Sequence, residues 1–128
     1  MKTIFVVDDN SINLLMAEEV LSEHYEVITM SSVSTMFELF NKMIPDMILL
    51  DIMMPDINGF VALEQLKTNT QYADIPVIFL TSRNDAATEA LGYTMGVADF
   101  IKKPFSKPEI LGRIKTILEP EAAKQDKK

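Results

Sequence analysis

The chain has 128 residues, a length that predicts a single domain, and 48% of them are hydrophobic, which is enough for a buried core. It contains no cysteine, so disulfides and thiolate metal sites are excluded. Its formal net charge of -7 argues against nucleic-acid binding by this domain, because contacts to phosphates need a clustered basic face.

Short apolar runs alternate with helix-like patterns along the first part of the chain. The β-branched run 3–7, TIFVV, predicts a buried strand. Residues 8–11 are of helix-capping types, and apolar residues follow them at helical spacing. A second strand is expected over 25–30, and the apolar stripe within 33–40 predicts a second helix.

The same alternation continues to the end of the chain. The remaining expected elements are a strand over 47–51, a helix through 60–66 that opens near Asp56 or Asn58, a strand over 77–82, an alanine-rich helix over 85–94 that ends near Gly96, a strand over 98–101 and a helix through 110–118 that stops at Pro120. Five apolar strands alternating with five helices predict a parallel sheet covered on both faces, which is a doubly wound α/β sandwich.

The expected domain occupies residues 1–119, and residues 120–128 are interpreted as a polar C-terminal tail or a linker stub. No segment approaches the ~18 consecutive apolar residues that a membrane span requires. The apolar run 4–7 is also too short for a signal peptide. We therefore expect a soluble protein of the cytoplasm.

Side chains that could form one site stand at the ends of four of the five expected strands, whereas nothing ionisable follows the strand over 25–30. Asp8 and Asp9 follow the first strand, Asp51 ends the third, Thr81 ends the fourth and Lys103 follows the fifth. Because sites in such sheets form beyond the carboxyl ends of the strands, these side chains should meet at one edge. Three neighbouring carboxylates repel unless a cation lies among them, and an all-oxygen ligand set suits Mg²⁺, with Mn²⁺ as a substitute.

This combination indicates phosphoryl transfer, with a carboxylate as the nucleophile and the metal and lysine neutralising the developing charge. Each residue also has a simpler interpretation. Asp8 and Asp9 could be first-turn helix acids, Asp51 a turn former, and the lysine a solvated surface charge. The methionines, Met53 and Met54 included, are interpreted as gap-filling core residues. The simpler interpretations need a separate reason for each residue at one end of four strands. A single shared site explains all of them at once.

Four segments of the sequence resemble the receiver domain of two-component response regulators. They are FVVDDN, ILLDIMMPDINGF, PVIFLTS and DFIKKPF, in matching order and spacing, and the resemblance spans about residues 2–118. It implies a flavodoxin-like (βα)5 fold with strand order 2-1-3-4-5. It also implies a signalling switch that is not an enzyme on a separate substrate, because it catalyses only its own phosphorylation and dephosphorylation.

The resemblance implies which residues form the reaction site. Asp51 is the expected phosphoacceptor. Asp8, Asp9 and Asp51, together with the backbone carbonyl of Met53, are the expected ligands of Mg²⁺. Lys103 is expected to pair with the phosphoryl oxygens.

The resemblance also implies a switch. Thr81 is expected to supply the hydroxyl that moves toward the phosphoryl group, and Phe100 the aromatic ring that turns inward when Thr81 shifts. The bond from Lys103 to Pro104 is expected to be cis. Lys102 should point away from the site, by strand alternation.

The partners implied by the resemblance are a histidine kinase or a histidine phosphotransfer protein as phosphodonor, and a downstream effector protein or domain as output. Neither a nucleic acid nor a membrane is implied for this domain. The oligomeric state implied is a monomer or a phosphorylation-dependent dimer.

Two other functions were weighed from the residues. A Mg²⁺-dependent phosphohydrolase with an aspartyl nucleophile usually carries an acid two residues further on, where Met53 stands and cannot transfer protons. A flavodoxin-like cofactor binder needs a phosphate-cradling loop after the first strand, where Asp8 and Asp9 would repel a phosphate. A phosphorylation-controlled switch is therefore favoured.

Overall fold

The computed structural model describes residues 1–55, 57–82 and 85–120. Residue 56 and the expected tail beyond residue 120 lie outside this description. The elements are β1 (Thr3–Val7), α1 (Ser11–Leu21), β2 (Glu26–Met30), α2 (Val33–Leu39), β3 (Met47–Asp51), α3 (Gly59–Lys67), β4 (Val77–Thr81), α4 (Ala86–Met95), β5 (Asp99–Lys102) and α5 (Lys107–Leu118). Each expected strand and helix is present, with bounds shifted by one to three residues in several cases.

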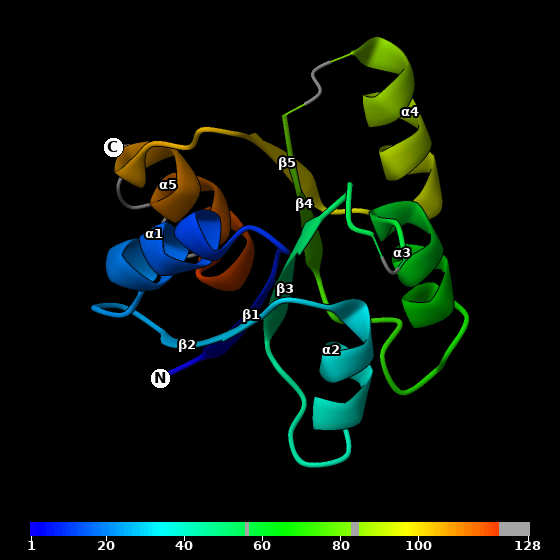
Figure 1. The fold of residues 1–128 in the computed structure, drawn as a ribbon, viewed down its shortest axis with the longest axis horizontal. Helices are drawn as coiled ribbons and strands as arrows, with labels where there is room; N and C mark the ends of the chain where they lie inside the picture. Colours follow the sequence, from blue (N-terminus) through cyan, green and yellow to red (C-terminus); the bar gives the residue numbers. More distant parts are fainter. Residues whose placement is uncertain (56, 83–84, 121–128) are drawn as a thin grey trace.

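The five strands form one parallel sheet in the order β2-β1-β3-β4-β5. Helices α1 and α5 cover one face of the sheet, and α2, α3 and α4 cover the other (Figure 1). The predicted doubly wound sandwich and its strand order are confirmed. The carboxyl ends of β1, β3, β4 and β5 therefore meet at one edge, where the loops to the following helices begin.

The sheet separates two apolar clusters, which explains why the central strands read as unbroken apolar runs. Alternate residues point to opposite faces. Phe5, Ile48 and Phe79 belong to the cluster under α2, α3 and α4. Ile4 and Leu49 belong to the cluster under α1 and α5. A polar residue within β1, β3 or β4 would leave one cluster with an unpaired group, so side chains that carry chemistry stand at the strand ends.

Each helix begins after a side chain that caps its first turn. Asn10, Ser32, Asn58, Asp85 and Ser106 accept hydrogen bonds from backbone N–H groups at the starts of their helices. Of the two residues considered for the start of α3, Asn58 is therefore the cap. These caps fix where each loop ends and its helix begins.

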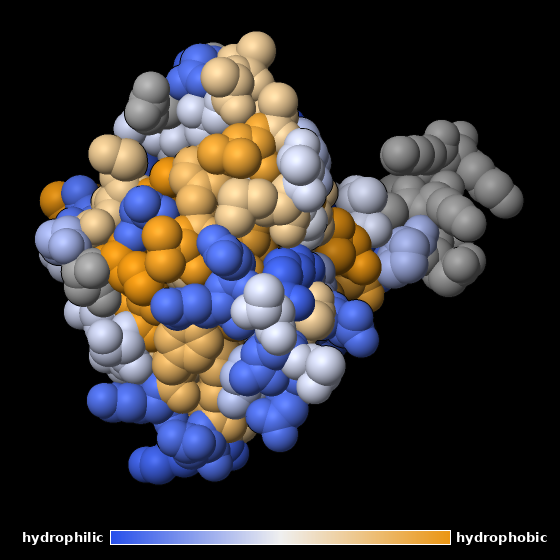
Figure 2. Space-filling model, turned by 90° about the vertical axis from the view of Figure 1, so that its right-hand side faces the viewer, coloured by the Kyte–Doolittle hydropathy of each residue, from blue (hydrophilic) through white to orange (hydrophobic). Residues whose placement is uncertain are grey.

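The surface over α2, α3 and α4 carries apolar side chains among charged ones (Figure 2). Val61 on α3 and Leu91 on α4 are 40% and 48% exposed. In the part of the chain that the structure describes, no helix is long and apolar enough to cross a membrane.

Gly92 allows α4 to lie close to β5. A Cβ atom at position 92 would stand 2.5 Å from Cζ of Phe100 and 3.2 Å from Cγ1 of Val97. Gly112 in α5 is different, because a Cβ atom there would meet nothing within 4 Å. The space beside Gly92 is thus filled by an aromatic ring, whereas the space beside Gly112 is open.

This contrast predicts opposite effects of one substitution on stability. Gly92→Ala should lower the free energy of unfolding by about 1–3 kcal/mol, because the Phe100 ring has to move. Gly112→Ala, the matched control, should raise it by about 0.5–1 kcal/mol, because alanine restricts the unfolded chain and favours the helix. Urea unfolding measures both. Equal effects of the two substitutions would contradict the close packing of Phe100 against α4.

Candidate phosphoacceptor site

Three carboxylates converge at the carboxyl edge of the sheet, as the sequence predicts. Asp8 follows β1 and is fully buried, and Asp51 ends β3 and is 4% exposed. Asp9 is exposed. Each of these acids places a carboxylate oxygen within 4.8 Å of the others. The cluster therefore has two buried acids and one that faces solvent.

Lys103 supplies the positive charge of this cluster. Its Nζ lies 2.8 Å from Oδ2 of Asp8 and 3.2 Å from Oδ1 of Asp51. Its backbone N–H donates to the carbonyl of Thr81 at 2.8 Å, and its bond to Pro104 is cis, as expected. Lys102 is exposed, as strand alternation predicts. Of the two neighbouring lysines, Lys103 is thus the one whose ammonium contacts Asp8 and Asp51.

Thr81 and Phe100 lie on the neighbouring strands β4 and β5. Thr81 ends β4 and is 4% exposed. Phe100 in β5 is 8% exposed, and its ring packs 5.6 Å from that of Phe79 and 5.3 Å from that of Tyr93. The ring therefore already lies inward in this structure, in the cluster beneath α4.

The loop after Asp51 is held tightly beneath the carboxylate. The N–H of Met53 donates to Oδ1 of Asp51 at 3.3 Å, and the N–H of Gly59 donates to the carbonyl of Ile52 at 2.7 Å. A Cβ atom at Gly59 would stand 2.8 Å from Cα of Ile52. Only glycine permits this approach without a backbone shift.

The interpretation of Met53 as a core residue is wrong, because its side chain is 60% exposed. Met54 is buried, as expected. Both residues follow the end of β3 at Asp51, and the loop directs Met54, but not Met53, into the apolar cluster under α2, α3 and α4. The backbone carbonyl of Met53 as a metal ligand stays a prediction.

Two asparagines that the sequence reasoning did not single out orient Asp8. The N–H of Asn10 donates to Oδ1 of Asp8 at 2.9 Å, and Nδ2 of Asn13 donates to Oδ2 at 3.3 Å. With Lys103, both oxygens of this buried carboxylate are occupied. Asn13 lies three residues after the cap Asn10, and this helical spacing is the signal that places it over the end of β1.

Burial raises the pKa of Asp51 to about 6, from its ordinary value of 3.8, and the negative charge of Asp8 adds to the rise. The ammonium of Lys103 and the N–H of Met53 act in the opposite direction. The pKa of Asp51 is therefore shifted by its surroundings, which is typical of a carboxylate that reacts.

The donor set fits a hard divalent cation. The cluster offers carboxylate oxygens from Asp8, Asp9 and Asp51, and Asp9 gives solvent access. Mg²⁺ takes few protein carboxylates and retains several waters, so an edge that is half buried and half open matches it.

The raised pKa of Asp51 predicts how stability depends on pH in metal-free protein. Between pH about 4 and about 6 the unfolded chain releases this proton while the folded protein keeps it, so ionisation progressively destabilises the fold. Asp51→Asn removes this cost. The stability gained by the variant over the original protein should therefore grow across this range and then level off.

Urea unfolding in EDTA at several pH values tests this dependence. Asp74→Asn, which removes an exposed carboxylate, is the control and should show a smaller change. A difference between Asp51→Asn and the original protein that stays constant with pH would contradict the assigned shift.

A parallel α/β sandwich with an acid cluster and a lysine at its carboxyl edge defines a class of signalling domains. The chain belongs to the response regulator receiver domain family, whose match covers residues 4–115. This membership favours the phosphorylation switch over the phosphohydrolase and the cofactor binder weighed from the sequence.

Similar proteins show the domain in different settings. The chain is 34% identical to a Vibrio cholerae protein named "Probable cyclic di-GMP phosphodiesterase", over 95% of this chain and 28% of that protein. It is 33% identical to hybrid signal transduction histidine kinase D of Dictyostelium discoideum, over 95% of this chain and 8% of that protein. The chain thus spans less than a third of the length of each of these curated relatives.

A solved structure of the DrrB receiver domain, described as activated by BeF3, has the same fold; DrrB is a Thermotoga maritima response regulator. The two chains superpose with a TM-score of 0.84 at 28% identity, covering 93% of this chain and 98% of that chain. The match confirms the flavodoxin-like receiver fold.

Proposed function

We propose that this domain is a phosphorylation-controlled signalling switch in which Asp51 accepts a phosphoryl group from a phosphohistidine donor in a Mg²⁺-dependent reaction. The observation that supports it best is the geometry around Asp51. Its carboxylate lies 3.2 Å from the ammonium of Lys103, in a cluster with Asp8 and Asp9. The cytoplasm is the expected location.

The proposed reaction is an in-line displacement at phosphorus. An oxygen of Asp51 forms a new O–P bond while the bond from phosphorus to the histidine nitrogen breaks, and the electron pair of that bond stays on the imidazole. The Lys103 ammonium pairs with the phosphoryl oxygens, and Asp8, Asp9 and Asp51 would hold Mg²⁺, which supplies charge neutralisation when bound. Water later attacks phosphorus, the bond between phosphorus and the Asp51 oxygen breaks, and inorganic phosphate leaves as the carboxylate is regenerated.

A protein phosphodonor is supported by the apolar outer face of α1. Ile12 and Leu15 are 66% and 60% exposed, and α1 begins two residues after Asp9. Exposed apolar side chains beside a reactive carboxylate suit a protein that docks there. The name of the hybrid histidine kinase relative supports the same donor class. A histidine kinase or histidine phosphotransfer protein is thus the proposed donor.

A downstream effector protein or domain is the proposed receiver of the signal, with no direct contact to nucleic acid or membrane by this domain. The domain itself acts as a monomer or as a dimer that forms on phosphorylation, and it turns over no separate substrate.

Labelling by a small phosphodonor tests the proposed reaction. Acetyl phosphate or phosphoramidate with Mg²⁺ should add one phosphoryl group to the intact protein, and EDTA should prevent it. Asp51→Asn should abolish the labelling, because the nucleophilic oxygen is replaced, whereas Asp74→Asn should not change it. Intact-protein mass spectrometry measures the result. Labelling that persists in Asp51→Asn would count decisively against the proposed acceptor.

The ammonium of Lys103 should weaken Mg²⁺ binding and speed the phosphorylation of Asp51. It lies between Asp8 and Asp51 and competes with a cation for them. Lys103→Met should therefore tighten Mg²⁺ binding by about 1–2 kcal/mol, the scale of a charged contact that is partly solvated. It should also slow phosphorylation by roughly 100-fold, because a charge that stabilises the transition state is lost.

Calorimetric Mg²⁺ titration and the labelling rate measure these two effects. Lys102→Met is the matched control, since Lys102 is exposed and adjacent in sequence, and it should change neither. Weaker Mg²⁺ binding by Lys103→Met would show that the lysine does not compete with the metal.

A further inference from the structure

The buried carboxylate of Asp8 lies at the amino end of α1, which holds it through both of its oxygens. The backbone N–H of Asn10 donates to Oδ1 of Asp8 at 2.9 Å, and Nδ2 of Asn13 donates to Oδ2 at 3.3 Å. Asp8 is fully buried, and Asn13 is half-buried. Because each oxygen has its own donor from α1, the two hydrogen bonds together set the plane of the carboxylate.

The position of Asn13 in the helix explains how its side chain reaches Asp8. Asn10 is the N-cap of α1, and its Oδ1 accepts from the N–H of Ile12 at 2.9 Å and from that of Asn13 at 3.1 Å. Asn13 is thus the third residue of the helix, from which a side chain commonly reaches back to the N–H of the cap. Here that N–H is bonded to Asp8, and the Asn13 side chain donates to the same carboxylate.

The residue type at position 13 suits this contact. Glutamate is common at the third position of a helix, but it would place a second negative charge against the buried carboxylate of Asp8. The first turn of α1 contains no acidic residue. The amide of Asn13 donates a hydrogen bond without adding charge, so it orients Asp8 and leaves the full negative charge of Asp8 to attract a cation.

Lys103 is the other donor to Oδ2 of Asp8, and it differs from Asn13 in what the proposed reaction asks of it. Its Nζ lies 2.8 Å from Asp8 and 3.2 Å from Asp51. In the proposed reaction this ammonium pairs with the phosphoryl oxygens, and a bound cation competes with it for Asp8. The hydrogen bonds from α1 have no such second partner in the reaction, so they are the contacts that keep Asp8 oriented throughout.

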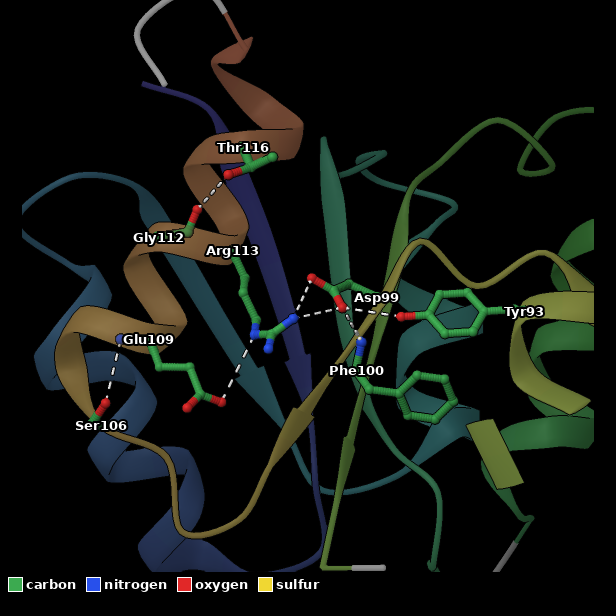
Figure 3. Close-up of polar contacts among 8 residues, drawn as sticks. All are labelled: Tyr93, Asp99, Phe100, Ser106, Glu109, Gly112, Arg113 and Thr116. Carbon is green, nitrogen blue, oxygen red and sulfur yellow. Dashed lines mark hydrogen bonds and ion pairs between the residues drawn. The ribbon is translucent and has the colours of Figure 1, made fainter. Parts of the chain in front are cut away.

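Asp99, the first residue of β5, shows the same kind of contact outside the acid cluster. Its Oδ1 accepts from the N–H of Phe100 at 2.7 Å, from Nη1 of Arg113 at 2.8 Å and from the hydroxyl of Tyr93 at 3.3 Å (Figure 3). Asp99 is not part of the acid cluster found among the described residues. Tyr93 and Asn13 thus donate to carboxylates at the same distance, one outside the cluster and one inside it.

We propose that Asn13 is a positioning residue that fixes the orientation of Asp8 and thereby favours Mg²⁺ over Ca²⁺ at this site. The inference rests on the proposed function, because it concerns the cation that Asp8, Asp9 and Asp51 would hold. Mg²⁺ demands near-ideal octahedral geometry, whereas Ca²⁺ accepts longer bonds and a more variable arrangement of oxygens. A carboxylate held by two donors meets the stricter demand, and a carboxylate that can turn meets only the looser one.

Titration of unphosphorylated protein with Mg²⁺ and, separately, with Ca²⁺ tests this role by calorimetry. Asn13→Ala removes the donor to Oδ2 of Asp8. It should lower the affinity for Mg²⁺ by about tenfold, because hydrogen-bonded partners of metal ligands have effects of this size or larger. The affinity for Ca²⁺ should fall by a smaller factor, so the ratio of the two affinities should fall several-fold.

Two controls separate this role from general effects. Tyr93→Phe removes a donor at the same 3.3 Å distance from a carboxylate outside the cluster, and should change neither affinity. Ser11→Ala alters an exposed side chain in the first turn of α1 and should also leave both unchanged. Equal losses of Mg²⁺ and Ca²⁺ affinity in Asn13→Ala, or an unchanged affinity for Mg²⁺, would overturn the proposal.

A second variant guards against damage to the fold. Asn13→Leu keeps nearly the size of the side chain but cannot donate, so it should lower the ratio of affinities as Asn13→Ala does, and urea unfolding in EDTA shows whether each variant is folded. Phosphoryl labelling of Asp51 with an unchanged ratio in the folded variants would overturn this inference alone. An original protein that binds no Mg²⁺ and takes up no label would overturn the proposed function and this inference together.

Discussion

Mutual repulsion among three carboxylates at one sheet edge is the constraint on which the site depends. Asp8 and Asp51 are buried, so each would be unfavourable as an unpaired charge. The ammonium of Lys103 reaches both. The segment between β5 and α5 thus places the positive charge of Lys103 at the ends of β1 and β3.

Much of the fold and of the site could be predicted, because both depend on where the apolar runs of the strands begin and end. Unbroken apolar runs indicate strands buried on both faces, and parallel strands bring their carboxyl ends together. Topology therefore predicts that one site contains Asp8, Asp9, Asp51, Thr81 and Lys103. Boundaries were less certain, and β5 begins and ends one residue later than expected.

Contacts that depend on helix rotation and on the distance between elements could not be predicted. The bond of Tyr93 to Asp99 and the fit of Gly92 over Phe100 require α4 to lie at one height above β5, which no sequence pattern specifies. The exposure of Met53 was mispredicted for a related reason. Hydrophobicity favours burial of Met53 and Met54 alike, but the path of the loop after β3 exposes the first and buries the second.

The division of the core by the sheet has a consequence for how two partners can share the domain. The apolar face of α1 rests on one cluster, and the contact between α4 and β5 rests on the other. A side chain that repacks beneath α4 does not touch the layer beneath α1, because the strands stand between them. The two clusters lie on opposite faces of the sheet, so a protein that docks on α1 and one that docks on α4 would each rest on a different apolar layer.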